Sequence, residues 1–342
     1  MITVRVPLGE RSYDVLVGHG ARSELAGLLP STARRAAIVT QSGIPLDIDP
    51  GMPTDVFTIG QGESHKSLAT IEELCRGFAT FGLTRNDVVI GVGGGMVTDV
   101  AGFAAASWHR GVAVVHVSTT LVGMVDAAIG GKTGVNLARA DGVGGKNLIG
   151  AYWQPAGVVC DLDALATLPT REVRCGRGEM AKYHFLTGDD LLAMDEVERI
   201  ARCVEIKAEV VAGDERESGR RALLNYGHTL AHALEIETDY ALAHGEAVAI
   251  GLIYAAHLAR CLGRIDDRRV EQHYEVVAGN YELDATLPQG VDPQHLIELM
   301  GRDKKALGGG LTFVLDGPDG VEVVTGVSVE AADEALRSMA AS

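Results

Sequence analysis

Short apolar runs and amphipathic stretches alternate along the first half of the chain. Ile2–Val6 and Tyr13–Val17 alternate apolar and polar positions, which predicts a β-hairpin. Ser67–Phe81 and Val97–Ser107 have the periodicity of helices. Five further apolar runs predict strands: Ala36–Thr40, Val56–Ile59, Asp87–Val92, Val112–Val117 and Gly157–Asp161. Strands that alternate with helices indicate a parallel sheet covered by helices.

Helical periodicity dominates after about residue 162. The helices predicted there are Val197–Val211, Arg221–Glu235, Gly245–Cys261, Arg268–Val277 and His295–Met300. Only Leu311–Leu315 and Val321–Val324 have the pattern of strands. The chain is therefore predicted to be an α/β protein, with an α/β domain at residues 1–162 and a mostly helical domain at residues 163–342.

Composition and charge exclude several classes of function. The 342 residues carry a formal net charge of −16, which disfavours binding to nucleic acid or to an anionic membrane. The most apolar stretch, 247–262, is too short to span a bilayer and contains His257 and Arg260. Five scattered cysteines and the lack of a signal peptide predict free thiols in the cytoplasm.

Glycines and hydroxyls follow two of the predicted strands. Gly93–Gly95 ends one strand and opens a helix that carries Asp99, and Ser118–Thr120 ends the next strand. Glycines let backbone N–H groups approach a phosphate, and a helix N-terminus favours negative charge. The GxGxxG fingerprint is absent, and a plain turn or helix cap is the alternative interpretation.

Two glycine–lysine segments predict an anion site within this acidic chain. Lys132 lies in the segment 130–134, and Lys146 lies in the segment 142–147. Lysines on glycine-rich loops suit a phosphate, although flexible solvated loops have the same composition. The basic segment 302–305 is either surface or a cover over an anion.

A polar stripe marks the predicted helix 221–235. Arg221, Asn225, His228 and His232 recur every three or four residues, which places them on one face of a continuous helix. His244 begins the next helix. Two histidines from neighbouring helices and one carboxylate could form a zinc site, with the carboxylate supplied by Glu179, Glu235 or Glu246.

Taken together, these segments resemble 3-dehydroquinate synthase and the wider sugar-phosphate cyclase family. The matching stretches run in family order over nearly the whole chain: GESHKSL (62–68), GGGMVTDVAGFAAA (93–106), STTLVGMVDAAIGGKTGVN (118–136), GKNLIGAYWQP (145–155), TLPTRE (167–172), GEMAK (178–182), IKAEVVAGDERES (206–218), LLNYGHTLAHALE (223–235), HGEAVAIGL (244–252) and RDKK (302–305).

The resemblance implies a Rossmann-like NAD-binding α/β domain and a helical metal-binding domain. Glu179, His228 and His244 match the family's ligands for Zn²⁺, which Co²⁺ could replace. The residues that match NAD contacts are Glu63, Lys66, Gly94, Gly95, Asp99, Thr119, Thr120, Thr167 and Leu168. Active-site matches are Asp126, Lys132, Lys146, Asn147, Lys207, Arg221, Asn225, His232 and one of Lys304 and Lys305; Asp126, Lys132 and Lys146 are also expected near the cofactor.

Arg110 matches an arginine that reaches into a neighbouring subunit's site, which implies a homodimer. Other positions depart from the family pattern. The link between Lys132 and Lys146 is lengthened around 137–143, and the segment between Lys182 and Lys207 is shortened. Thr40-Gln41 replaces a more polar pair, and His184 replaces a small residue.

The reaction implied is conversion of 3-deoxy-D-arabino-heptulosonate 7-phosphate to 3-dehydroquinate and phosphate, a step of aromatic amino-acid biosynthesis. NAD is oxidant and then reductant within one turnover, so it is not consumed. The alternatives are aminodehydroquinate synthase, cyclases of neutral sugar phosphates, and a metal-dependent polyol dehydrogenase. A non-enzymatic NAD-binding module is disfavoured by the complete Glu179, His228 and His244 set.

Overall fold

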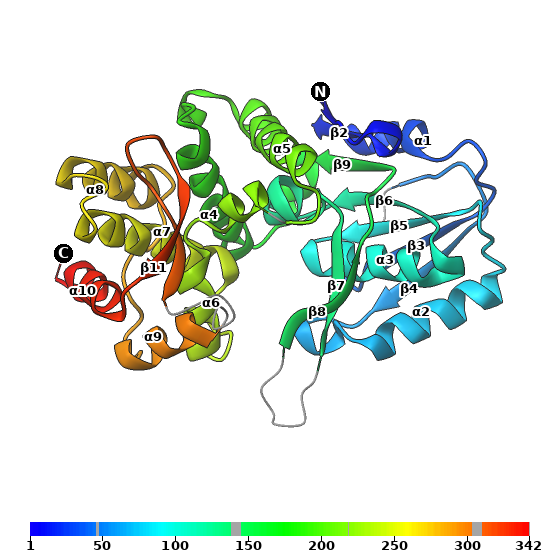
Figure 1. Ribbon diagram of the computed structural model, residues 1–342. Coiled ribbons are helices and arrows are strands. Elements are labelled where there is room, and N and C mark those ends of the chain that lie inside the picture. The colour runs from blue at the N-terminus through cyan, green and yellow to red at the C-terminus, as the bar shows by residue number, and fades with distance from the viewer. Residues whose placement is uncertain (46–47, 138–144, 218, 303–309, 342) are drawn as a thin grey trace. The chain divides into compact units, whose positions relative to one another are not determined.

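The computed structural model describes residues 1–45, 48–137, 145–217, 219–302 and 310–341 (Figure 1). The chain forms two compact units. The first contains Met1–Pro169 and Asp195–Arg216, and the second contains Thr170–Met194 and Glu217–Ser342. The sequence predicted one boundary at residue 162, whereas the structure places residues 163–169 and 195–216 with the sheet of the first unit.

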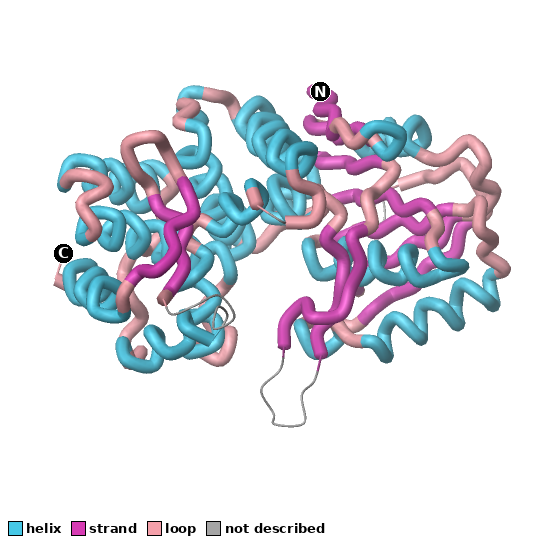
Figure 2. The backbone as a smooth tube through the Cα atoms, viewed as in Figure 1, coloured by secondary structure: helices cyan, strands magenta, loops and turns pink. Residues whose placement is uncertain are grey.

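A seven-stranded sheet forms the centre of the first unit (Figure 2). Its strand order is β1-β2-β9-β6-β5-β3-β4. The hairpin strands β1 and β2 pair antiparallel, and all other neighbours in the sheet are parallel. These strands are β1 (Ile2–Val6), β2 (Tyr13–Gly18), β3 (Ala36–Gln41), β4 (Thr54–Ile59), β5 (Val88–Gly93), β6 (Ala113–Ser118) and β9 (Gly157–Asp161). The predicted α/β class is confirmed.

The central strands bury both of their faces. Every residue of β5 and β9 is buried, and so is all of β6 except Ala113. Successive residues point to opposite faces of a strand. Accordingly, Val89 packs in one apolar cluster, whereas its neighbours Val88 and Ile90 pack in another. These two clusters explain why the parallel strands read as continuous apolar runs rather than as alternating ones.

The α-helices that the described residues of this unit form are α1 (Leu25–Leu28), α2 (Leu68–Phe81), α3 (Gly95–Ser107) and α5 (Glu196–Gly213). Ser67 caps α2 by accepting a hydrogen bond from the backbone N–H of Thr70. Asp195 and Glu198 form a reciprocal capping box at the start of α5. The α5 helix packs on β1 and β2, which is why a segment from the second half of the sequence belongs to the first unit.

The described lysine-bearing parts of the two glycine–lysine segments lie in strands, whereas the sequence suggested loops. Lys132–Leu137 forms β7 and Gly145–Tyr152 forms β8, and the two strands pair as an antiparallel hairpin. Close backbone contact explains the glycines: a Cβ added at Gly150 would lie 2.0 Å from the carbonyl oxygen of Thr133. Most of the lengthened segment 137–143 lies outside the described residues.

The second unit is mostly helical, as predicted. Its helices are α4 (Thr170–Thr187), α6 (His228–Glu237), α7 (His244–Cys261), α8 (Asp267–Tyr274), α9 (Pro293–Arg302) and α10 (Val329–Ala340), beside the strand pair β10 (Leu311–Leu315) and β11 (Glu322–Val327). The α7 helix is buried almost throughout and contacts α4, α6, α8 and α10. Neither α4 nor α10 was predicted as a helix.

The predicted continuous helix 221–235 is interrupted. Arg220–Asn225 forms a 3₁₀ turn, and α6 begins only at His228. Gly227 lies between them with a φ of 78°, a left-handed conformation that glycine adopts readily. The four polar residues of this segment therefore do not share one helical face, and only His228 and His232 belong to α6.

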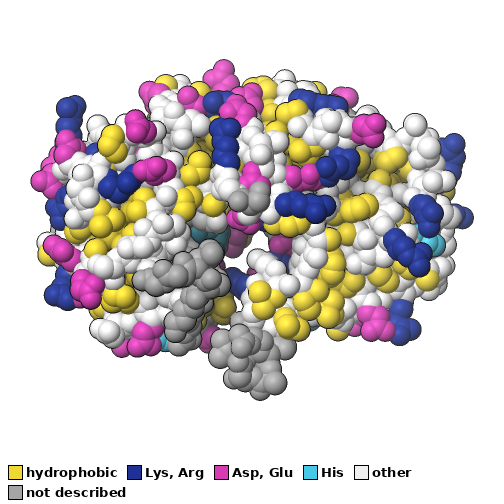
Figure 3. Space-filling view, viewed as in Figure 1, with side chains coloured by type: hydrophobic (Ala, Val, Ile, Leu, Met, Phe, Trp, Pro, Cys, Tyr) yellow, Lys and Arg dark blue, Asp and Glu magenta, His cyan; other side chains and the backbone are white. Residues whose placement is uncertain are grey.

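Among the described residues, no helix combines the length and the apolar character needed to cross a bilayer. Acidic and basic side chains are interspersed over the face drawn in Figure 3. Although the whole chain has a net charge of −16, the acidic side chains on this face do not form one continuous patch.

Candidate functional site

The predicted phosphate cradle lies at the carboxyl end of β5 and β6. Gly94 is the N-cap of α3, and the backbone N–H of Thr119 donates to the carbonyl oxygen of Gly93 at 3.0 Å. A Cβ added at Gly94 would lie 2.8 Å from Cγ2 of Thr120, so this position needs glycine. The two strand ends are therefore pressed together, with the N-terminus of a buried helix beside them.

Lys66 joins this edge of the sheet to the hairpin. Its side chain is buried, and its Nζ lies 2.5 Å from Oδ2 of Asp99 on α3 and 2.5 Å from Oδ1 of Asn147 on β8. Glu63, in the turn before Lys66, is exposed. The structure thus brings together three of the predicted NAD contacts and one predicted substrate contact.

A second ion pair of the first unit involves Asp126 and Lys207. Asp126 lies in a π-helical turn, 123–127, and Lys207 lies on α5. The Nζ of Lys207 lies 2.8 Å from Oδ1 of Asp126 and 2.5 Å from its carbonyl oxygen. These partners are distant in sequence, and they meet because α5, which belongs to the same unit, packs against the turn 123–127.

The remaining predicted residues of the first unit are more exposed. Lys132 and Asn147 are exposed on the hairpin, and Lys146 is partly buried. Thr167 is exposed and Leu168 partly buried after β9. Arg110 is exposed, and its φ of 66° is left-handed. Its exposure leaves the Arg110 guanidinium accessible to another molecule.

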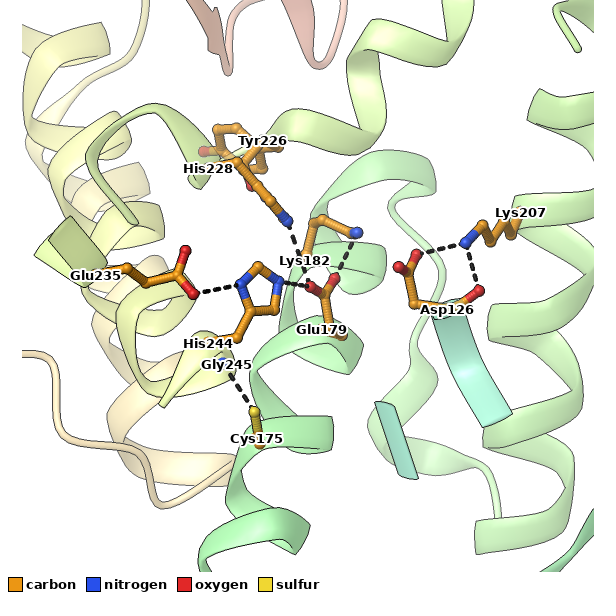
Figure 4. A network of polar contacts seen from close by, with 10 residues as sticks. All are labelled: Asp126, Cys175, Glu179, Lys182, Lys207, Tyr226, His228, Glu235, His244 and Gly245. Atoms are coloured by element: carbon orange, nitrogen blue, oxygen red, sulfur yellow. Dashed lines mark hydrogen bonds and ion pairs between the residues drawn. The ribbon is translucent and has the colours of Figure 1, made fainter. Parts of the chain in front are cut away.

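Three side chains of the second unit converge on one point. Glu179 on α4, His228 at the start of α6 and His244 at the start of α7 bring one ligand atom each within 4.8 Å of the others. Oε1 of Glu179 lies 3.0 Å from Nε2 of His244 and 3.3 Å from Nε2 of His228 (Figure 4). One carboxylate oxygen and two imidazole nitrogens are a donor set that suits Zn²⁺ or Co²⁺.

Outer partners orient both histidines. Nδ1 of His228 lies 3.0 Å from the carbonyl oxygen of Tyr226, and Nδ1 of His244 lies 3.5 Å from Oε1 of Glu235 (Figure 4). With a metal ion bound, a proton on each Nδ1 would leave the lone pair of Nε2 for the ion. This arrangement is typical of metal-binding histidines, so the residues present fit a divalent ion.

Charges around Glu179 set the ionisation of the cluster. Burial favours a neutral Glu179, but the nearby Lys182 ammonium and His228 hold its pKa well below the usual range. Nζ of Lys182 lies 2.5 Å from Oε2 of Glu179. Burial likewise opposes a charged His244, but Glu179 and Glu235 outweigh it and raise the pKa of His244 to about 10.

The helices that carry these ligands touch at backbone level. A Cβ added at Gly178 would lie 2.2 Å from the carbonyl oxygen of Gly245, and one added at Gly245 would lie 1.9 Å from that of Cys175. The backbone N–H of Gly245 also donates to Sγ of Cys175 at 3.0 Å. Both glycines neighbour a ligand, so the close crossing of α4 and α7 fixes the distance between Glu179 and His244.

Other predicted residues of the second unit are spread more widely. Arg221 is only 1% exposed. The Nδ2 of Asn225 donates to Oε1 of Glu217 at 3.2 Å. His232 is exposed, with its ring 5.6 Å from that of His228. Lys304 and Lys305 lie outside the described residues.

Two polar residues of the cluster were not identified as such from the sequence. Lys182 ends the GEMAK segment, and its position one helical turn after Glu179 was a signal for contact. Glu235 was weighed as a metal ligand, yet the structure places it behind His244 as an outer partner. Helical spacing alone could not separate these roles.

Comparison with known proteins gives consistent matches over most of the chain. The family model for the 3-dehydroquinate synthase N-terminal part matches residues 56–175, and that for the C-terminal part matches residues 176–306. A putative aminodehydroquinate synthase of Amycolatopsis mediterranei (strain S699) is 52% identical over 339 residues, covering 98% of this chain and 94% of that protein.

Two further matches widen this picture. A 3-dehydroquinate synthase of Thermobifida fusca (strain YX) is 40% identical over 344 residues, covering 92% of this chain and 90% of that protein. A solved structure of 2-deoxy-scyllo-inosose synthase with carbaglucose-6-phosphate, NAD⁺ and Co²⁺ has a TM-score of 0.88 and 25% identity, covering 98% of this chain and 100% of that one.

Proposed function

Because this chain belongs to the 3-dehydroquinate synthase family of sugar-phosphate cyclases, we propose that it cyclises a heptulosonate 7-phosphate with loss of phosphate, using NAD and one divalent metal ion. The observation that carries this proposal is the convergence of Glu179, His228 and His244, with Glu235 and Tyr226 behind the two histidines. When bound, the ion supplies a Lewis acid and the dinucleotide a reversible hydride acceptor.

Residues of the first unit are proposed to bind the cofactor and the substrate phosphate. Gly94 and Gly95 allow close backbone approach to the dinucleotide pyrophosphate, and Asp99 and Lys66 supply polar contacts beside them. Lys132 and Asn147 on the hairpin, together with one of Lys304 and Lys305, are proposed to hold the substrate phosphate. Binding of NAD⁺ and Co²⁺ by the related 2-deoxy-scyllo-inosose synthase supports both cofactor assignments.

Residues of the second unit are proposed to recognise a substrate carboxylate. Arg221 offers a guanidinium that can pair with both carboxylate oxygens, and Asn225 offers an amide donor. His232 is exposed beside the metal ligands, and we assign it proton transfer at a substrate hydroxyl. Neutral sugar phosphates have no carboxylate, so the presence of Arg221 favours an acidic substrate over them.

Two acidic substrates fit these residues equally: 3-deoxy-D-arabino-heptulosonate 7-phosphate and its amino analogue. The first makes the chain a 3-dehydroquinate synthase. The second is supported by the 52% identity with a putative aminodehydroquinate synthase, against 40% with a 3-dehydroquinate synthase. Measuring kcat/KM for both compounds decides between them, and the identities lead us to expect a preference for the amino analogue.

Catalytic use of NAD tests the reaction class. With NAD far below the substrate concentration, phosphate release should continue for many turnovers without accumulation of NADH, and chelation should stop it. NADH formed in proportion to substrate would instead indicate a polyol dehydrogenase. We also propose a homodimer in which Arg110 contacts the neighbouring subunit's site, to be checked by solution mass and by mixing Arg110→Ala with a second inactive variant.

A further inference from the structure

The β7–β8 hairpin contains an irregularity at a residue assigned to the substrate phosphate. Val135 pairs with Ile149 and Leu137 pairs with Gly145, so the single residue Asn136 faces three residues of the other strand, 146–148. Within this bulge, Asn147 has a left-handed φ of 55°. Bulges redirect side chains and leave backbone groups without their ladder partners. The bulge therefore sets the backbone conformation of Asn147, beside Lys146.

Asn136 supplies the contacts that the bulge lacks. Its side-chain Oδ1 accepts a hydrogen bond from the backbone N–H of Asn147 at 2.9 Å. Its Nδ2 donates to Oε2 of Glu63 at 2.6 Å, and its own backbone N–H donates to the carbonyl oxygen of Lys66 at 2.8 Å. This orientation of the amide is the one that satisfies both neighbours, because the carboxylate of Glu63 accepts and the N–H of Asn147 donates.

Lys66 closes the network from the other side. Its Nζ contacts Oδ1 of Asn147 and Oδ2 of Asp99. Asn147 is thus held at its backbone by Asn136 and at its side chain by Lys66. Every link lies within the first unit and joins groups assigned to the cofactor, Glu63, Lys66 and Asp99, with a group assigned to the substrate phosphate.

We propose that Asn136 is a positioning residue that holds the 146–148 bulge against the Glu63–Lys66 segment and thereby aligns the phosphate contacts with the cofactor contacts. The proposal rests on the function proposed above for Asn147, and on the match of Glu63 to an NAD contact of the family. The side chain of Asn136 makes two hydrogen bonds that can be removed separately. Its Oδ1 accepts from the backbone of Asn147, and its Nδ2 donates to the carboxylate of Glu63.

Two substitutions distinguish these hydrogen bonds. Asn136→Ala removes both of them. The backbone amide of Asn147 should then exchange with deuterium about 10-fold faster, and KM for the sugar phosphate should rise about 10-fold, as expected for one lost hydrogen bond. Asn136→Asp keeps the acceptor but sets a carboxylate against Glu63. Exchange at Asn147 should then stay near the wild-type rate, while the Kd for NAD rises about 10-fold.

A rescue and a control complete the design. Glu63→Gln removes the carboxylate that opposes the one introduced by Asn136→Asp, so in the Glu63→Gln background Asn136→Asp should leave the Kd for NAD equal to that of Glu63→Gln alone. Asn86→Ala, at an exposed residue before the amino end of β5, should change neither exchange at Asn147 nor KM. Metal content and melting temperature should be equal in all variants.

Two results would overturn the proposal: unchanged exchange at Asn147 in Asn136→Ala, or an unchanged KM together with a lower kcat and a lower melting temperature, as a purely structural role requires. Deuterium exchange needs no substrate, so it tests the positioning of Asn147 even if the wild-type protein releases no phosphate. In that case the proposed function fails while the role of Asn136 in the hairpin is still decided by exchange.

Discussion

The candidate metal cluster and the proposed phosphate cradle differ in what presents their polar groups. Glu179, His228 and His244 are side chains on three helices, and the crossing of α4 and α7 sets their spacing. The cradle at the ends of β5 and β6 consists mainly of backbone, with Gly94 admitting Thr120 at close range. A site built from side chains can be abolished by one substitution, whereas a backbone cradle can only be narrowed or distorted.

The largest effect is expected at the cluster. Glu179→Gln removes the carboxylate that both histidines face and should abolish metal binding. A Lewis acid contributes several kcal/mol to catalysis, so phosphate release should fall more than about 1,000-fold. Metal content is measured after dialysis, alongside the rate. His232→Ala is the matched control, because it should retain the metal while losing activity; loss of metal from that variant would place His232 among the ligands.

Acid sensitivity of the first unit is the next largest effect. His116 on β6 is buried, and burial lowers its pKa to about 4. In the unfolded chain His116 therefore binds a proton below about pH 6.5, whereas in the folded chain it binds one only below about pH 4. Stability is lost as the pH falls through this range.

The substitution His116→Leu removes this titration. Its Nδ1 has no hydrogen-bond partner among the described residues, so replacement by a carbon side chain leaves no partner group unsatisfied. Between pH 7 and pH 4 the wild-type free energy of unfolding should fall by about 3 kcal/mol more than that of the variant. Urea unfolding at both pH values measures the difference. If the free energy of unfolding of both proteins changed equally with pH, His116 would have the same pKa in the folded and unfolded chains, and the prediction would be wrong.

Arg221 offers a test of side-chain recognition in the second unit. Arg221→Met keeps much of the stem and removes the charge. A charge-assisted carboxylate pair worth about 1.5–3 kcal/mol predicts a loss of kcat/KM of about 10–150-fold. Arg220→Met, at the exposed neighbour, is the control and should be silent. If Arg221→Met had a lower melting temperature but an unchanged kcat/KM, Arg221 would have a structural role and not a role in substrate recognition.

The smallest effect concerns the cradle. Gly94→Ala sets a methyl group against Cγ2 of Thr120, and the Kd for NAD should rise about 10-fold, or about 1.4 kcal/mol. Thr120→Ser in the same background removes Cγ2 and should restore part of the affinity. Gly27→Ala, where no atom lies within 4 Å of the added Cβ, should leave Kd unchanged. Equal NAD binding by Gly94→Ala would mean that the cradle is not tight.

Most of the fold could be predicted from hydrophobic periodicity. The strand Gly157–Asp161 was predicted with its observed bounds, and Ser67–Phe81 differs from α2 only by its cap. The β7–β8 hairpin was missed because its glycines, needed where the strands touch, also signal loops. The break at Gly227 was missed because the hydrophobic periodicity continues across it. A single residue with a left-handed φ does not change the pattern of apolar positions on either side.

The candidate site was less predictable from residues alone. Spacing placed His228 and His244 in one cluster but left Glu179, Glu235 and Glu246 as equal candidates. The structure separates them, since Glu235 lies behind His244, and Glu246 caps α7 by accepting from the backbone N–H of Ala243. The link between Asp126 and Lys207 depends on how α5 packs, which local sequence does not encode.

The placement of α5 limits how this gene can be divided. A fragment that ends after Pro169 encodes every strand of the seven-stranded sheet yet omits the helix whose apolar face covers β1 and β2. The complementary fragment would contain α5 but lack β1 and β2, so the apolar face of α5 would lose the strands on which it packs. Split-protein complementation or exchange between related enzymes should therefore move residues 195–216 together with the sheet, by circular permutation or by supplying α5 as a separate peptide.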